Sequence, residues 1–443
     1  AVKIISTGYQ KIPKERSTGS FVLLDQELIN RSISLDVISR LDNITPGLLF
    51  DRRFVGSPGI SIRGLSTIQS DANPLIIVDN FPYEGDVNNI NPNDIESITV
   101  LKDAAASSIW GARAGNGVIV ITTRRGSLEQ PVSVQLRSNV TLGSKPDLYY
   151  GRNFLNSSDF IEVERSLFEH GFFTWQETDP NHSAMSPVVE LLIDERDGLI
   201  SSEEAESILS RWKENDIRDD IARYMYRTSV NQQHSLSLSG GGSQVSYYLS
   251  GGFDKNITNL VRDGYERLTV NSMLTYHPLS KLEVTSGFLF CNTIDKTNNN
   301  GGIRSLSGKA LYPYNRLADE NGTPMALLRD YDEDFVNRAE PDGLLDWSYV
   351  PLDDMDNSDY TIKTNDIRIN TSVKYSISAS LYIEARYQFE QQNTNTRNLQ
   401  SVELYSTRDM INKFAYAEGG QLVFPVPVGD ILDLRYRDRK SVV

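Results

Sequence analysis

An antiparallel membrane β-barrel preceded by a compact α+β domain is the fold class that this sequence predicts. Two-residue alternation of apolar and polar residues begins near residue 131 and returns in several later segments, which is the pattern of strands with one apolar and one polar face. Short and long connections between these segments alternate along the chain, as they do in outer-membrane barrels. Residues 17–126 lack this alternation and carry short apolar segments divided by turn signals, which is typical of a small mixed domain.

Composition excludes several classes of function. The 44 basic and 59 acidic residues give a net charge of −15, which argues against a nucleic-acid partner because such proteins need basic surface. The single cysteine, Cys291, excludes a disulfide within the chain and any cysteine-rich metal centre. The four histidines show no i, i+4 pairing. We therefore expect no metal site and no cofactor. A run of about 18 apolar residues, as a membrane-spanning helix requires, is also missing.

The first domain, residues 17–126, is predicted to combine short strands with one helix. Turn signals at Thr45–Gly47, Ser57–Gly59 and Asn91–Asn93 separate its apolar segments. Asp103–Trp110 is rich in small residues and compatible with a helix that Gly111 ends. The segments predicted as strands are Gly59–Ile62, Pro74–Asp79, Ile95–Leu101 and Gly117–Thr122.

Seven later segments alternate apolar and polar residues, and an eighth begins near Asp430–Tyr436. Each is about as long as the 9–11 residues that a tilted strand needs to cross a bilayer. Backbone groups in lipid must all be paired, so such strands belong to a closed barrel. The seven segments are marked by Val132–Leu142, Leu236–Leu238, Val245–Phe253, Leu268–Tyr276, Leu282–Phe290, Ile367–Ile377 and Leu381–Phe389.

The connections predict which ends of the strands face outward. Tight turns occur at Gly240–Ser243, Pro278–Ser280 and Ser378–Ala379. Between them lie the long stretches 143–231 and 294–363, which we expect to be extracellular loops. A soluble β-sandwich also has alternating strands and stays an open alternative. The regular order of short and long connections favours the barrel.

The long loops are predicted to carry structure of their own. Ser157–Phe168 and Ser202–Trp212 have the pattern of amphipathic helices, with serines placed as N-caps. The second loop is strongly acidic at Asp330–Asp334 and Asp353–Asp356. Oxygen ligands of this kind can bind a divalent cation. Solvated surface is the more common role of a charge run, and we favour it here.

No pattern in the sequence indicates an enzyme. The glycines of Gly111–Gly117 lack the spacing of a dinucleotide-binding loop and are better explained as a turn. A Gly-x-Ser-x-Gly motif is missing, and no serine, histidine and carboxylate stand in a convincing arrangement. Paired carboxylates are too abundant to indicate a glycosidase.

Part of the first domain closely resembles the plug signature of the SusC/RagA family of TonB-dependent transporters. The resemblance runs through Pro74–Pro82 and Asn89–Thr123, and Ser61–Gly64 is similar to the arginine–glycine motif of the plug. Gln233–Gly242 and Tyr312–Asn315 resemble early barrel segments of the same family. The similarity therefore extends over most of the chain.

The resemblance implies a plug that fills a barrel of about 22 strands. Family members import bulky nutrients such as glycan fragments or peptides across the outer membrane of Gram-negative, Bacteroidetes-type bacteria. The implied partners are TonB, a SusD-like surface lipoprotein acting as a lid, the lipid bilayer and lipopolysaccharide. Seven strands cannot enclose a plug, so the remaining barrel sequence or a second chain is expected as well. A signalling or scaffold role without transport is the alternative function.

On this basis the chain divides into a TonB-contact segment and linker (1–16), a plug (17–126) and the first part of a barrel (127–443). The resemblance implies that TonB grips a short segment ahead of the plug by β-strand addition. The alternative is that 1–16 is only a lead-in to the plug. The predicted TonB-contact residues are Val2, Lys3, Ile4, Ile5, Ser6, Thr7 and Gly8.

Two plug arginines, Arg63 and Arg113, are the candidates for a latch between plug and barrel. A buried guanidinium group needs a carboxylate or carbonyl partner. The inward-facing carboxylates predicted to serve are Glu384, Glu390 and Asp366. The alternative is that both arginines are ordinary exposed residues, since most surface ion pairs contribute little.

Overall fold

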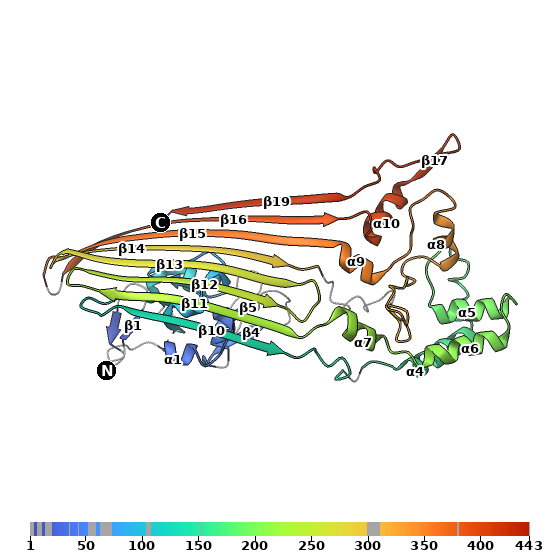
Figure 1. Cartoon of the computed structure of the whole chain (residues 1–443), viewed down its shortest axis with the longest axis horizontal. Coiled ribbons are helices and arrows are strands. Elements are labelled where there is room, and N and C mark those ends of the chain that lie inside the picture. The colour runs from blue at the N-terminus through green and yellow to red at the C-terminus, as the bar shows by residue number, and fades with distance from the viewer. Residues whose placement is uncertain are drawn as a thin grey trace.

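The computed structural model contains a small amino-terminal domain and one large antiparallel sheet (Figure 1). A two-stranded hairpin, β1 (Ile4–Ser6) with β2 (Lys11–Pro13), precedes the domain. The residues that the structure describes are 4–6, 11–13, 20–34, 36–42, 44–51, 59–62, 73–102, 108–151, 153–298, 311–378 and 381–442.

The amino-terminal domain is built on a five-stranded sheet in the order β3-β8-β9-β6-β7. Its β6 and β9 strands are parallel and the other pairs are antiparallel. Asp79 and Asn80, with φ of 49° and 74°, form the two-residue turn between β6 and β7, a conformation that these residue types tolerate. The strands are β3 (Phe21–Asp25), β6 (Leu75–Val78), β7 (Phe81–Pro82), β8 (Ile95–Leu101) and β9 (Val118–Thr123); β4 (Leu48–Asp51) and β5 (Gly59–Ile62) pair separately.

Short helices cover this sheet and close its core. The side chains of Asp25 and Asp36 cap the first two of them, as expected for helix N-termini. Ile98 of β8 is fully buried among apolar side chains from the sheet and the helices. Gly111 has a φ of 66° and interrupts the last short helix. These elements are α1 (Gln26–Ile29), α2 (Val37–Leu41), η2 (Val87–Asn89), η3 (Pro92–Asp94) and η4 (Ser108–Ala114).

The large sheet has eight antiparallel strands in sequence order. All seven segments predicted from alternation are strands, and the eighth strand, β19, starts where the sequence predicted. The strands have 11–19 residues, so many exceed the length that a tilted bilayer crossing requires. They are β10 (Ser133–Gly143), β11 (Ser229–Gly241), β12 (Val245–Ile257), β13 (Gly264–Leu279), β14 (Leu282–Lys296), β15 (Ser358–Ser376), β16 (Tyr382–Gln400) and β19 (Ile431–Val442).

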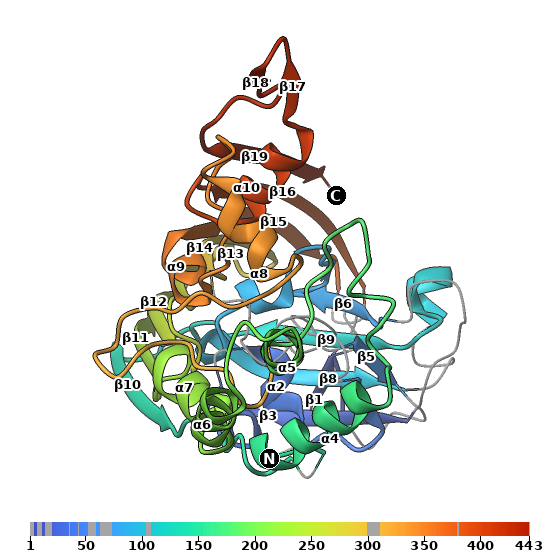
Figure 2. The ribbon, with the colours of Figure 1, turned by 90° about the vertical axis from the view of Figure 1, so that its right-hand side faces the viewer.

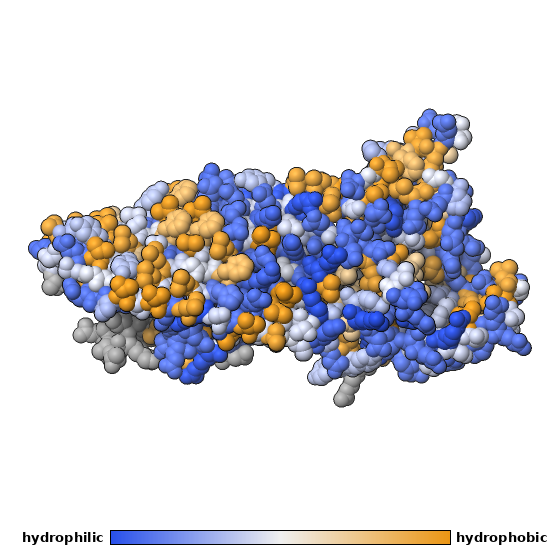
Figure 3. Space-filling view, in the orientation of Figure 1, coloured by the Kyte–Doolittle hydropathy of each residue, from blue (hydrophilic) through white to orange (hydrophobic). Residues whose placement is uncertain are grey.

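The two faces of this sheet differ in chemistry. On its outer face, apolar side chains gather over the half of the strands away from the helical loops (Figure 3). Leu249 is exposed there, whereas its neighbours Tyr248 and Ser250 are buried on the inner face. The sheet curves around the amino-terminal domain (Figure 2), and hydrogen bonds join that domain to the inner face. We call this inner face the wall.

The long connections form a helical cap at one end of the strands (Figure 1), which we define as residues 144–228, 311–357 and 401–430. Predicted helices 157–168 and 202–212 are present as α4 and α6, but their N-caps are Asn156 and Ser201. The cap contains α4 (Ser157–Glu169), α5 (Pro187–Arg196), α6 (Ser202–Lys213), α7 (Ile217–Asp220), η5 (Ile221–Met225), α8 (Glu333–Ala339), α9 (Pro351–Asn357), α10 (Tyr405–Phe414), β17 (Tyr416–Glu418) and β18 (Gln421–Val423).

Apolar contacts tie the three connections of the cap together. Tyr314 packs with residues of α4, α5 and α6, and Trp347 packs with Tyr405 of α10. Leu317 and Leu352 pack with residues of α7 and η5. Within the described residues, no helix combines the length and apolar character needed to cross a bilayer.

Candidate functional site

The boundary between the amino-terminal domain and the wall is the first candidate site, and it is polar. Segment 83–94, which contains η2 and η3, supplies most of the contacts from the domain. Tyr83 Oη and Asn89 Nδ2 each donate to Asp366 Oδ2 of β15 at 3.3 Å. All three residues are buried. A carboxylate of the wall is thus bound by neutral donors of the domain.

Two further hydrogen bonds extend this boundary along the sheet. Asn91 Nδ2 donates to Thr269 Oγ1 at 3.0 Å, and Tyr248 Oη donates to Asp94 Oδ1 at 3.0 Å. Gly252 lies beside Asn91, and a Cβ atom at this glycine would stand only 2.2 Å from Asn91 Nδ2. A side chain at 252 would therefore prevent this close approach of domain and wall.

Arginines of the wall complete the boundary. Arg267 forms an ion pair with Asp254 at 2.7 Å, and its Nη1 donates to the carbonyl oxygen of Asn88. Both side chains are almost fully buried, and pairing of this kind is what makes a buried charge tolerable.

Two other arginines act in the same region. Arg439 pairs with Glu390 and also donates to the carbonyl oxygen of Glu84. The Arg368 guanidinium carbon lies 5.2 Å from the centre of the Tyr83 ring, within the range of a cation–π contact. The wall therefore supplies three arginines and the three carboxylates Asp254, Asp366 and Glu390.

Burial at this boundary changes the acidity of groups on the amino-terminal domain. It raises the pKa of Asp94, although a hydrogen bond from Tyr248 acts in the opposite sense. Burial and the charge of Asp366 raise the pKa of Tyr83, so its hydroxyl stays a donor. Burial and the nearby Arg267 lower the pKa of Arg40 to about 10. These pKa shifts have the direction expected when the charged form of each group loses its contact with water.

The structure corrects the partners predicted for the latch arginines. Arg113 is exposed and pairs with Glu84 of its own domain at 2.8 Å. Glu384 pairs instead with Arg386 of the same strand at 2.8 Å. Asp366 and Glu390 do face the domain, but the arginines nearest to them belong to the wall.

Arg113 therefore does not contact the predicted carboxylates, and Arg63 lies outside the described residues. Sequence reasoning missed Arg267 and Arg439. Arg267 is buried on the inner face of β13, whereas the next residue, Leu268, is exposed on the outer face. The alternation of β13 could therefore have indicated that Arg267 points inward.

The predicted TonB-contact segment coincides in part with a strand. Ile4–Ser6 forms β1 and pairs with Lys11–Pro13 in an antiparallel hairpin. Val2, Lys3, Thr7 and Gly8 lie outside the described residues. Within the part of the chain that the structure describes, this sheet has only two strands, so one edge of β1 has no strand beside it.

A large cavity lies between the amino-terminal domain and the wall. It has a volume of about 1230 Å³. The domain contributes Glu84, Asn88 and Arg113, and the wall contributes Arg267 and Asp295. Glu84, Asn88 and Arg267, which join domain and wall, thus border this space, so movement of the domain would change the size of the cavity.

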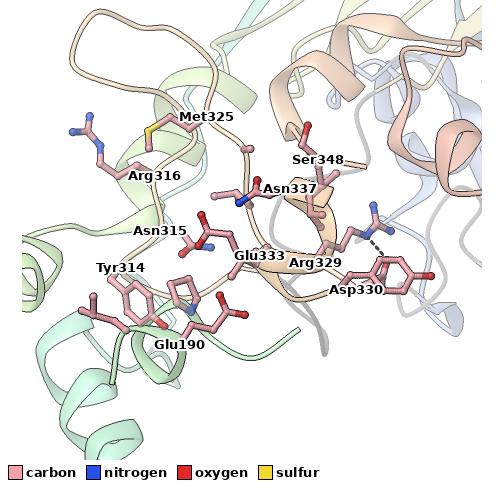
Figure 4. Close-up of a pocket in the computed structure, with 18 of the residues that line it drawn as sticks. Glu190, Tyr314, Asn315, Arg316, Met325, Arg329, Asp330, Glu333, Asn337 and Ser348 are labelled. Atoms are coloured by element: carbon pink, nitrogen blue, oxygen red, sulfur yellow. Dashed lines mark ion pairs between the residues drawn. The ribbon is translucent and has the colours of Figure 1, made fainter. Parts of the chain in front are cut away.

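A second cavity, of about 530 Å³, lies within the helical cap (Figure 4). Figure 4 shows Glu190 beside Tyr314 on one side, and Arg329 with its partner Asp330 on the other. The Arg329 guanidinium also lies 4.6 Å from the ring centre of Tyr349. The volume is within the usual range for small-molecule pockets.

Two carboxyl groups in the cap, the buried Glu164 and the half-buried Glu190, have no cationic partner among the described residues. Glu164 of α4 accepts a hydrogen bond from Tyr314 Oη at 3.0 Å, and burial raises its pKa to about 7. Burial, followed by the negative charges of Glu333 and Asp332, raises the pKa of Glu190 to about 8. Both groups therefore take up protons near neutral pH.

Comparisons with known proteins agree on the nature of the amino-terminal domain. The family profile for the TonB-dependent receptor plug domain matches residues 13–118. The TonB-dependent receptor SusC of Bacteroides thetaiotaomicron is 25% identical over 281 residues, covering 61% of this chain and 24% of SusC. TonB-dependent receptor P39 of Formosa agariphila is 26% identical over 342 residues, covering 75% of this chain and 28% of P39.

A solved structure supports the same fold for nearly the whole chain. The RagAB peptide importer in its open-open state superposes with a TM-score of 0.69 and 18% sequence identity. The match covers 90% of this chain and 43% of the importer chain. The chain spans about a quarter of the length of the curated relatives, with 24% of SusC and 28% of P39 covered.

Proposed function

This chain is part of a TonB-dependent receptor of the SusC/RagA type, and on that premise we propose that it takes part in active import of a bulky nutrient across the outer membrane. Its fold is that of a plugged β-barrel, for which the chain supplies the plug and eight strands. The nutrient is a peptide or a glycan fragment, and a SusD-like lipoprotein closes over the barrel as a lid.

The polar boundary between plug and wall is the observation that carries this proposal. An immobile plug would be joined to the wall by apolar packing like that inside the plug itself. Segment 83–94 instead meets the wall through hydrogen bonds and ion-paired arginines. Water can replace contacts of this kind when the two surfaces separate. The boundary therefore suits a plug that moves during each transport cycle.

The latch in this proposal consists of wall arginines rather than plug arginines. Arg267 and Arg439 hold the carbonyl oxygens of Asn88 and Glu84. A pull on the amino terminus would draw segment 83–94 away from both guanidinium groups. Arg113, which pairs with Glu84, stiffens the plug side of this contact.

TonB would pull through the hairpin ahead of the plug. The extended conformation of β1 suits β-strand addition, in which main-chain hydrogen bonds provide the grip. This mode of binding depends on strand geometry and little on side-chain identity.

A proline in β1 tests the proposal. Ile4→Pro removes a backbone donor and disfavours the strand, whereas Ile4→Val preserves it. In cells carrying the full-length receptor, we expect Ile4→Pro to abolish uptake of labelled peptide or oligosaccharide pools and crosslinking to TonB. Ile4→Val should behave as the native receptor does. The complex purified in mild detergent should also contain a SusD-like lipoprotein.

The test separates import from the other roles. Crosslinking to TonB without uptake of any pool would favour a signalling or scaffold function. Uptake that stays at the native level both in Ile4→Pro and in a strain lacking TonB would contradict active import.

A further inference from the structure

The cavity of the helical cap has an excess of negative charge on one side. Glu190, Asp194 and Glu333 line it, and the charged groups acting on Glu190 are Glu333 and Asp332, both acidic. Those acting on Asp194 are also acidic, and burial with these charges raises its pKa. Backbone N–H groups of Glu333 and Met185 act on the Glu190 carboxyl, but one of its oxygens, Oε1, is inaccessible to solvent and has no hydrogen-bond partner within the described residues. A buried polar atom without a partner is costly unless a ligand supplies one.

The cations that border the cavity already have partners. Arg329 lies 3.5 Å from Asp330 and is held between the rings of Tyr349 and Tyr405. Arg316 lies 3.8 Å from Asp220. Neither arginine therefore stabilises the ionised form of Glu190, and a cationic ligand could do so.

The carboxylates are not arranged for a metal ion. Across the residues that the structure describes, no three histidine, cysteine, aspartate or glutamate side chains converge closely enough to hold one. An organic cation can instead reach the carboxylates one at a time. The walls fit such a ligand, because aromatic faces attract organic cations. These aromatic residues are Trp212, Tyr314, Tyr331, Trp347, Tyr349 and Tyr405.

We propose that this cavity binds an organic ammonium group, with Glu190 as its principal anionic contact. The carboxylate of Glu190 accepts a charge-assisted hydrogen bond from the ammonium group, and Glu333 adds to the attraction. The carbon chain or ring next to the nitrogen packs on the aromatic wall. A lysine side chain or peptide amino terminus and an amino sugar share this chemistry.

The proposal deepens the proposed function, because it assigns a chemical class to cargo that meets the outer loops first. It does not need transport to be tested. Binding to the full receptor in detergent is measured by calorimetry and by tryptophan fluorescence, since Trp212 and Trp347 line the cavity. The probes are tri-lysine and the glucosamine trimer. N-acetylated triglutamine and the N-acetylglucosamine trimer are the matched probes without an ammonium group.

Glu190→Gln is the test variant and Glu203→Gln the matched control. Both glutamates lie in the first turn of a cap helix, but Glu203 is exposed and outside the cavity. We expect Glu190→Gln to weaken binding of the ammonium probe about tenfold or more, and Glu203→Gln to leave it unchanged. Glu333→Gln provides a second variant with a smaller loss, in case Glu190→Gln folds poorly.

Proton release gives an independent readout. Glu190 has a pKa of about 8 raised first by burial, so it is largely protonated at pH 7. An ammonium ligand favours the charged carboxylate and displaces this proton. Calorimetry in two buffers of different ionisation enthalpy should detect release in the native receptor and not in Glu190→Gln.

The outcomes decide between specific binding and general attraction. Tighter binding of tri-lysine or of the glucosamine trimer supports the site and identifies the source of the ammonium group. Failure of both probes to bind, or equal losses in Glu190→Gln and Glu203→Gln, would overturn it. Neither result bears on TonB-dependent uptake, which the Ile4→Pro experiment tests separately.

Discussion

At the plug–wall boundary two of the three buried wall carboxylates form ion pairs with arginines, whereas the two most perturbed carboxyl groups of the helical cap have no cationic partner among the described residues. In the boundary, Asp254 pairs with Arg267, and Glu390 pairs with Arg439. In the cap, Glu164 meets a neutral tyrosine and Glu190 meets other acids. Charge is thus balanced in one region and left unbalanced in the other.

The location of the balancing charges is also informative. Arg267 and Asp254 both belong to the wall, as do Arg439 and Glu390. Segment 83–94 of the plug meets Asp366 and Arg267 through neutral groups and a carbonyl oxygen, and its carboxyl group at Asp94 meets the neutral Tyr248. Withdrawal of the plug would therefore leave the ion pairs of the wall intact. The cap, in contrast, holds carboxyl groups whose charge changes with pH or with a bound cation.

The largest effect is expected when the balance in the wall is broken. Arg267→Ala leaves Asp254 buried without its partner, and loss of one member of a buried pair costs about 3–5 kcal/mol. We expect a large fall in the thermal unfolding temperature of the full receptor in detergent. The plug should also become more accessible to protease, because the contact with Asn88 is lost.

Arg435→Ala provides the control for this change. Arg435 also lies on a strand and pairs with an aspartate, Asp433, at 2.9 Å, but its side chain is 77% exposed. Exposed pairs contribute at most about 1 kcal/mol. Equal destabilisation by Arg267→Ala and Arg435→Ala would contradict the view that the boundary depends on balanced buried charge.

The unbalanced charge of the cap predicts a dependence on pH. The pKa of Glu164 is raised from 4.5 to about 7, so the folded state binds the proton more tightly than the unfolded state does. Its stabilising contribution is complete below about pH 4.5 and is lost as the pH rises through about 7. The shift corresponds to roughly 3 kcal/mol.

Glu164→Gln should remove the part of this dependence that Glu164 contributes and leave the part due to Glu190, because the amide resembles the protonated acid and still accepts from Tyr314. The free energy of unfolding of the cap, compared between pH 4.5 and pH 8, is the measurement. Glu169→Gln, at an exposed position of the same helix, is the control. A native receptor whose cap is equally stable at both pH values would show that Glu164 is ionised without cost.

The wall was predictable because one physical condition acts on every residue of its strands. Lipid on one side and a polar lumen on the other impose a period of two, as at Leu249 and Ser250. The alternation could not predict which arginines contact segment 83–94 of the plug. This contact depends on cross-strand register, such as that placing Arg368 opposite Glu390, and on where segment 83–94 meets the sheet.

The helical cap was harder to predict because its helices are buried by distant segments. In α5, Val188, Val189, Leu191 and Leu192 are all buried, so the sequence shows no single apolar stripe. The acidic run near 330 was interpreted as solvated surface. Asp332 instead caps α8, and Asp330 accepts a hydrogen bond from Tyr405 at 2.9 Å. Tertiary contacts of this kind leave no local pattern.

The smallest effect is expected from one neutral hydrogen bond across the boundary. Tyr248→Phe removes the donor to Asp94, a plug residue whose carboxyl is buried. Loss of one partner of a buried group costs about 1–2 kcal/mol, less than the loss of Arg267. Tyr247→Phe is the matched control, because the neighbouring residue faces the opposite side of the strand.

Because the carboxyl of Asp94 belongs to the plug, the readout is accessibility of the plug to protease. Tyr248→Phe should increase it slightly and Tyr247→Phe should not. If Tyr248→Phe loosened the plug as much as Arg267→Ala does, neutral contacts would hold the plug as firmly as the wall arginines, and the comparison between balanced and unbalanced charge would lose its explanatory value.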